Sequence, residues 1–240
     1  MTQEPVSSEN KPKHEMKLLL RGVFGILLLL TFLGGILFLS AGTTYWRSAW
    51  VLIGLYGIFL FIFLFYTANR DPELLKERGK KSANIKPWDK VIAGIYNFLL
   101  IAMLIICGLD VGRFLWSSVP FWLQLVGMAL VILGGLIMGW VTMHNTFLSR
   151  YARIQDDRGH RVVTDGPYRT VRHPMYAVSL FWFPAIPLML GSYTALLPGL
   201  AITVLYVVRT ALEDRMLLDE LPGYKEYAQQ TRFRLIPGIW

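Results

Sequence analysis

The chain has 240 residues, of which 54% are apolar and only 17% are charged, and its mean hydropathy is +0.45. Soluble domains carry about a quarter charged residues, so this composition excludes an ordinary soluble globular protein as well as an intrinsically disordered one. Cys107 is the single cysteine, which excludes an intramolecular disulfide and argues against a cysteine-based metal cluster.

Six apolar segments follow one another, each bounded by charged residues, glycine or proline. The first four are long enough to span about 30 Å of hydrocarbon, whereas the last two, at roughly sixteen residues each, reach only ~24 Å. We expect these two to form a helical hairpin turning at Leu190-Gly191-Ser192, and their length leaves open whether it crosses the whole bilayer. The predicted fold is an all-α, polytopic membrane helix bundle of five to six transmembrane segments, at residues 18–41, 48–67, 90–110, 119–143, 175–190 and 194–209.

The net charge of +8 comes from basic residues that alternate between loops. Seven Lys and Arg lie from Arg70 to Lys90 and six from Arg150 to Arg172, whereas the intervening loops hold one or none. By the positive-inside rule, both termini and these two long loops are predicted to be cytoplasmic. The charge is thereby explained by topology and by contact with anionic membrane lipids, and a nucleic-acid partner is not expected.

The chain divides into three regions. Residues 1–16 are polar and predicted to be a disordered cytoplasmic tail, and residues 17–145 to be a transmembrane scaffold. The first apolar segment exceeds the ~7–15 residues of a secretory signal, so we expect an uncleaved anchor. Residues 146–240 hold most of the polar material that chemistry could use, namely a loop, the hairpin and a polar tail.

Glycine spacing favours close helix packing. Gly108 and Gly112, and likewise Gly135 and Gly139, form small-x-x-x-small patterns that let helix backbones approach. No G-x-G-x-x-G motif follows a strand-like segment, so a Rossmann nucleotide site has no support.

The run Arg172-His173-Pro174-Met175-Tyr176 stands at the start of the predicted hairpin. A residue before proline is disfavoured in the α region and proline suits the first helical position, so His173 should be extended and Pro174 should begin a helix. Unpaired backbone N–H groups and neighbouring arginines would then form an anion site for a water-soluble cofactor. The alternative is an interfacial anchor, because Tyr and Arg are common where helices leave the bilayer.

Arg209 and Glu213 lie one helical turn apart at the end of the last apolar segment. The two could form an ion pair that only stabilises the helix. However, charge at membrane depth is unfavourable unless it faces a polar cavity or a partner. The adjacent Asp214 either needs a nearby cation, if the site is closed, or simply faces water.

A longer pattern carries a resemblance. The run from Gly159 to Tyr176, which reads G-H-R-V-V-T-D-G-P-Y-R-T-V-R-H-P-M-Y, is followed by the hairpin, by R-x-x-x-E-D from Arg209 and by G-Y-x-x-Y from Gly223. Over about residues 150–240 this order resembles the isoprenylcysteine carboxyl methyltransferase family and its bacterial relatives. Residues 1–145 share only the general pattern of apolar spans. The pattern is specific for the family but not for the substrate.

The resemblance implies an integral membrane enzyme that takes S-adenosylmethionine from the cytosol and a lipophilic acceptor from the bilayer. Arg209 and Glu213 are the implied catalytic residues, with Arg209 towards the substrate and Glu213 towards the cofactor. Arg153 stands where the family has a glutamine-like residue, so Gln155 is a second candidate there, and Arg232 is a looser match in the tail. The implied cofactor-binding residues are Arg153, Gln155, His160, Arg161, Val162, Val163, Tyr168, His173, Pro174, Met175, Tyr176, Glu213 and Tyr224.

Methyl transfer from a sulfonium is an in-line displacement that requires alignment and exclusion of water, and neither a metal nor a covalent nucleophile. A carboxylate acceptor could be anchored by Arg209 and would need no general base. An amine, as in a phospholipid, or a thiol would require Glu213 or His173 to take a proton.

Two other classes remain as alternatives. Membrane sterol and steroid reductases share an R-H-P-x-Y-like element but bind NADPH, and this tail lacks their arginine-aspartate pattern. A transporter would place charged groups near the bilayer centre, whereas here the strongly polar residues lie at the predicted cytoplasmic edge.

Overall fold

The computed structural model of the chain describes residues 10–72, 74–75 and 85–240, and these residues form helices and loops without a β-strand. The predicted all-α class is confirmed. The helices are α1 (Asn10–Ala41), α2 (Arg47–Arg70), α4 (Pro87–Gly108), α5 (Phe121–His144), α6 (Pro174–Leu190), α7 (Leu196–Glu220) and α8 (Tyr224–Gln230). A π-helical turn, η1 (Leu109–Phe114), continues α4, and the short 3-10 turns η2 (Asp156–Arg158) and η3 (Gly166–Arg169) lie between α5 and α6.

Within the described residues, five helices are long and apolar enough to cross a membrane. They cover Leu18–Ala41, Arg47–Arg70, Pro87–Phe114, Phe121–His144 and Leu196–Glu220. Helix α6 has 17 residues and a length of about 25 Å. The chain is therefore a multi-pass membrane protein, in agreement with the predicted five to six segments.

The N-terminal helix is longer than predicted. Helix α1 begins at Asn10, so residues 10–16 are helical rather than part of a disordered tail. The physical reason is local: Lys, Glu and Met are favourable helix formers, and Pro12 lies in the first turn, where its missing N–H breaks no hydrogen bond. Residues 1–9 of the predicted tail lie outside the described residues.

The second arm of the hairpin also exceeds its prediction. Helix α7 has 25 residues and ends at Glu220, whereas the apolar pattern ends at Arg209. The helix continues because good helix formers follow Arg209 and because its buried charges have partners. The turn itself lies where expected, since α6 ends at Gly191 in the left-handed conformation, φ 94°.

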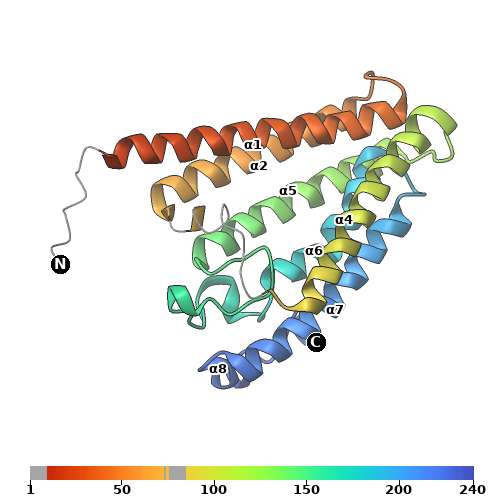
Figure 1. Cartoon of the computed structure of the whole chain (residues 1–240). Coiled ribbons are helices and arrows are strands. Elements are labelled where there is room, and N and C mark those ends of the chain that lie inside the picture. Colours follow the sequence, from red (N-terminus) through yellow and green to blue (C-terminus); the bar gives the residue numbers. More distant parts are fainter. Residues whose placement is uncertain (1–9, 73, 76–84) are drawn as a thin grey trace.

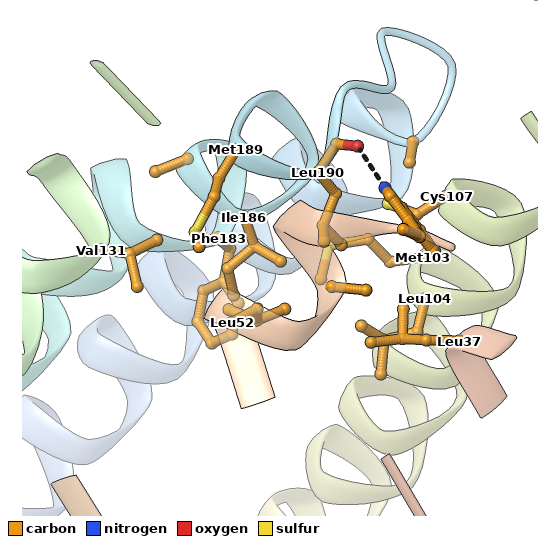
Figure 2. Packing of buried hydrophobic residues seen from close by; sticks show 14 of the residues in the cluster. Leu37, Leu52, Met103, Leu104, Cys107, Val131, Phe183, Ile186, Met189 and Leu190 are labelled. Atoms are coloured by element: carbon orange, nitrogen blue, oxygen red, sulfur yellow. Dashed lines mark hydrogen bonds between the residues drawn. The ribbon is translucent and has the colours of Figure 1, made fainter. Parts of the chain in front are cut away.

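The bundle has two distinct ends (Figure 1). Helix α6 packs against α5 and α7, while α1 packs against α2 and α4. The α5–α6 loop and α8 lie at one end, and the turns that follow α1, η1 and α6 lie at the other. The apolar core joins six helices, with Leu37 of α1, Leu52 of α2, Met103 of α4, Val131 of α5 and Leu190 of α6 in one cluster (Figure 2). Ile202 of α7 belongs to the same cluster.

Glycine allows close approach at some of the predicted positions. A Cβ on Gly108 or Gly112 would overlap with Ser40 or Ala41 of α1, and one on Gly135 would overlap with the Phe59 ring. Gly139 faces open space, so the second predicted motif packs at one of its glycines only.

The buried carboxylate of Asp110 links the turns at the end of the bundle opposite α8. Asp110 in η1 is fully buried and accepts hydrogen bonds of 2.6 Å from the hydroxyls of Ser117, Ser192 and Thr194. The Ser117 N–H adds a fourth at 2.7 Å. These bonds tie the α6–α7 turn to the end of α4.

Candidate functional site

A cavity of about 550 Å³ lies where α5, α6 and α7 meet the α5–α6 loop and α8. Its walls combine basic, acidic and aromatic side chains from segments far apart in the sequence. Among the residues singled out from the sequence, those lining it are Arg153, His160, Arg161, Val162, Val163, Tyr168, His173, Pro174, Met175, Tyr176, Arg209, Glu213 and Tyr224.

The start of α6 has the predicted backbone. His173 has φ −126° and ψ 65°, and Pro174 is the first helical residue. The expected free N–H groups are partly occupied, however, because those of Tyr176 and Ala177 both donate to the His173 carbonyl at 3.0 Å. A ligand here would therefore rely more on side chains than on backbone donors.

Asp214 is the centre of a buried polar cluster and does not face water. It is fully buried and accepts from Arg172 through Nε and Nη2, at 2.7 and 2.9 Å. The Tyr224 hydroxyl donates to it at 2.9 Å, and Arg234 Nε at 2.8 Å. His173 Nε2 lies 3.1 Å from the same carboxylate. Of the two possibilities left open for Asp214, the one with nearby cations is correct.

Arg172 also holds the C-terminal tail. Its Nη1 donates to the carbonyls of Thr231 and Arg232 at 2.9 Å, and its backbone N–H donates to Phe233 at 2.9 Å. The tail thus runs beside the start of α6. Arg232 contributes its backbone carbonyl to this contact, while its side chain is exposed and does not line the cavity.

Arg209 has a stronger partner than the expected one. The distance between Arg209 Nε and Glu213 Oε2 is 4.0 Å, but Nε lies 2.9 Å from Oδ1 of Asp89 in α4. Nη2 donates to the other Asp89 oxygen at 3.2 Å and to the Arg150 carbonyl at 3.1 Å. Glu213 accepts a hydrogen bond of 2.6 Å from the Tyr176 hydroxyl. The pairing of Arg209 with Asp89 joins two segments 120 residues apart.

Aromatic rings form one wall of the cavity. The Tyr206 ring is the hub, with ring-centroid distances of 5.6 Å to Tyr96, 5.4 Å to Tyr176 and 5.4 Å to Phe183. The Arg209 guanidinium lies 5.3 Å from the Tyr176 ring centroid. Tyr96 is not predicted from the sequence because one tyrosine in an apolar helix carries no distinguishing signal. Asp89 is not predicted because an acid in a first helical turn is common.

The loop between α5 and α6 is stabilised by hydrogen bonds and ring contacts among its own residues. Gln155, a candidate cofactor contact, is buried but does not line the cavity. Its side chain donates to the Phe147 carbonyl and accepts from Arg158 Nη1 at 2.8 Å. The His160 ring lies 4.9 Å from the Phe147 ring, and burial lowers the pKa of His160 from 6.5 to about 4, aided by the cations Arg153 and Arg158. His160 is therefore neutral at pH 7.

The chain resembles membrane methyltransferases. Residues 122–221 match the family described as phospholipid methyltransferase. The chain is 26% identical over 115 residues to protein-S-isoprenylcysteine O-methyltransferase B of Arabidopsis thaliana, which covers 46% of this chain and 58% of the relative. It is 33% identical over 104 residues to the cobalt-zinc-cadmium resistance protein CzcN of Cupriavidus metallidurans, which covers 42% and 47%. The predicted resemblance to the isoprenylcysteine carboxyl methyltransferase family is confirmed.

A solved structure of the eukaryotic intramembrane Ras methyltransferase ICMT is also similar, with a TM-score of 0.47 and 20% identity over 87% of this chain and 74% of that one. The chain matches about half the length of its curated relatives, between 47% and 61%. Within the described residues, no three His, Cys, Asp or Glu side chains are grouped so that they could hold a metal ion.

Proposed function

We propose that this protein transfers a methyl group from S-adenosylmethionine to a lipophilic acceptor at a membrane surface. The observation that carries the proposal is the composition of the single cavity described above. It joins the polar residues implied by the resemblance to an aromatic wall formed by Tyr96 of α4, Phe183 of α6 and Tyr206 of α7. A water-soluble donor and an apolar acceptor need such a cavity, with one polar side and one apolar side.

The residues present fit S-adenosylmethionine. A volume of about 550 Å³ is within the usual range of roughly 300–1,000 Å³ for sites of ligands this size. Glu213 would pair with the ammonium group, and Arg153 or Arg161 with the carboxylate. The rings of Tyr176 and Tyr206 would favour the sulfonium charge through their faces. The neutral His160, beside Phe147, would offer an uncharged planar surface to the adenine ring.

When bound, this cofactor supplies an electrophilic methyl group on a sulfonium. The protein residues then have to align the acceptor with that methyl group and exclude water from it. The tail held by Arg172 and the packed ring of Tyr224 would close the cavity on the cytoplasmic side. No residue has to form a covalent bond to the transferred carbon.

We propose a carboxylate as the acceptor, with Arg209 as the group that orients it. Because Arg209 Nε faces Asp89 and Nη2 donates to Asp89 and to the Arg150 carbonyl, the acceptor would meet Nη1 of the guanidinium. A carboxylate is ionised at neutral pH, so its attack requires no general base. Its apolar chain would lie along the wall made by Tyr96, Phe183 and Tyr206.

A phospholipid amine is the second candidate. The matched family carries that description, and the carboxylate of Glu213 beside the ring of Tyr176, which packs against Tyr206, is an arrangement that also suits an ammonium group. In that case Glu213 would take the proton that the amine must lose before it attacks.

The location follows the charge pattern. We propose that the α5–α6 loop, α8 and both termini lie on the cytoplasmic side, where the basic residues contact anionic headgroups and the donor is available. The acceptor would enter from the bilayer.

The test is calorimetry on the full chain in lipid nanodiscs, followed by a radiolabel transfer assay. We expect S-adenosylmethionine and its demethylated product to bind and NADPH to give no heat. The label should then move to N-acetyl-S-farnesylcysteine rather than to phosphatidylethanolamine vesicles. Binding of NADPH alone would contradict the proposal in favour of a reductase, and labelling of the phospholipid alone would replace the carboxylate with the amine.

A further inference from the structure

The strongest unassigned feature is the buried carboxylate of Asp89, which lies in the first turn of α4, outside the region matched by the methyltransferase family. An acid in a first turn usually faces solvent and interacts with the helix dipole. Asp89 is instead fully buried. A buried carboxylate is unfavourable unless it is paired, so its partners indicate what it does.

Those partners come from two segments that line the cavity, the α5–α6 loop and α7. From the loop that carries Arg153, the Ala152 N–H donates a hydrogen bond of 2.7 Å to Asp89 Oδ2. From α7, Arg209 contacts Asp89 through Nε and Nη2. Arg209 Nη2 also donates to the Arg150 carbonyl at 3.1 Å, which closes the connection between loop and helix.

We propose that Asp89 is a positioning residue that sets both the place and the effective charge of Arg209 and fixes the cofactor side of the cavity to the acceptor side. This inference rests on the proposed methyl transfer. An unpaired guanidinium would bind an acceptor carboxylate tightly in the ground state and withdraw charge from the attacking oxygen. With Asp89 beside it, Arg209 can orient the carboxylate while that oxygen remains nucleophilic.

The chain offers a matched control. Lys86 Nζ and Glu220 Oε1 form a 2.6 Å ion pair between the N-cap of α4 and the last residue of α7, and both side chains are partly exposed. This pair joins the same two helices as Asp89 and Arg209 but does not line the cavity. Glu220→Gln therefore removes a link between α4 and α7 without changing the site.

The experiment compares Asp89→Asn, Asp89→Ala and Glu220→Gln in nanodiscs, by calorimetry with S-adenosylmethionine and by kinetics with N-acetyl-S-farnesylcysteine. Asparagine keeps an acceptor for the Ala152 N–H but removes the charge, so cofactor affinity should stay within about threefold while kcat falls about tenfold and KM does not rise. Alanine removes both functions and should also weaken cofactor binding about tenfold. Glu220→Gln should match the wild type.

Double variants keep the test decisive if a single change impairs folding. Arg209→Gln combined with Asp89→Asn removes both buried charges together, and its kinetics should equal those of Arg209→Gln alone. The inference is wrong if Asp89→Asn has wild-type kinetic constants, if it raises KM without changing kcat, or if its effect is the same factor in both backgrounds. If the wild type binds no S-adenosylmethionine, the proposed function itself fails. If it binds the cofactor but does not methylate this probe, equal cofactor affinity of the asparagine and alanine variants overturns the inference alone.

Discussion

Arg172 and Asp214 face each other through two parallel hydrogen bonds, Nε to Oδ1 at 2.7 Å and Nη2 to Oδ2 at 2.9 Å, inside the protein. The pair joins the start of α6 to the end of α7, and through the carbonyls of Thr231 and Arg232 it also holds the tail. Because this ion pair connects α6, α7 and the tail, a substitution of either residue should lower the stability of the protein.

Asp214→Ala is expected to destabilise the protein by roughly 3–5 kcal/mol, because it leaves the Arg172 charge buried without its carboxylate. Thermal unfolding in detergent measures this loss. The tail should also become sensitive to protease near Thr231. Asp219→Asn, a change at an exposed acid on the same helix, is the control and should leave the melting temperature unchanged. An Asp214→Ala protein as stable as this control would show that the pair contributes little.

Glu213→Gln tests a functional charge. The variant keeps an oxygen for the Tyr176 hydroxyl but loses the negative charge proposed to pair with the ammonium group of the cofactor. We expect affinity for S-adenosylmethionine to fall about tenfold or more while stability changes by less than about 1 kcal/mol. Calorimetry and thermal unfolding give the two numbers. Loss of stability with unchanged affinity would mean that Glu213 serves only the helix.

His160 predicts a pH dependence of stability. Burial lowers its pKa in the folded protein to about 4, whereas an unfolded histidine titrates near 6.5. The unfolded state therefore binds a proton first as the pH falls. The contribution of His160 is fully present above pH ~6.5 and is lost as the pH falls through about 4. Thermal melts between pH 4 and 7 should show this slope, and His160→Gln should reduce it; an identical slope in the variant would assign it to other groups.

Asp110→Asn separates stability from the proposed activity. An amide cannot accept all four hydrogen bonds that Asp110 receives from Ser117, Ser192 and Thr194, so we expect a loss of about 1–3 kcal/mol. Because this cluster lies at the end of the bundle away from the cavity, affinity for S-adenosylmethionine should be unchanged at temperatures where the variant is folded. Reduced affinity in a fully folded variant would show that the two ends are coupled.

Hydropathy and proline chemistry predict most of the fold. The apolar segments locate the spanning helices, and the preference of proline for the first helical position places the start of α6 at Pro174. The start of α1 and the end of α7 differ from the prediction. An apolar segment is bounded by the first charged residue, whereas a helix continues through charged residues that are exposed or paired.

The site is predictable only where its residues are close in sequence. His173, Tyr176, Arg209 and Glu213 all belong to short runs whose spacing suggests a shared role. Asp89 and Tyr96 contribute through tertiary contact, which a single sequence does not record. Gln155 is polar and lies two residues after Arg153, yet its amide hydrogen-bonds within the loop and does not line the cavity. Nothing in the local pattern distinguishes these two orientations.

The contribution of α4, with Tyr96 lining the cavity and Asp89 pairing with Arg209, has a consequence for synthesis. Asp89 and Tyr96 leave the ribosome well before Arg209, which follows Asp89 by 120 positions. The complete cavity therefore cannot form before α7 has been synthesised and has packed against α4. Until then α4 carries a carboxylate without its arginine, and a fragment beginning after α5 would lack the side of the cavity that Tyr96 forms.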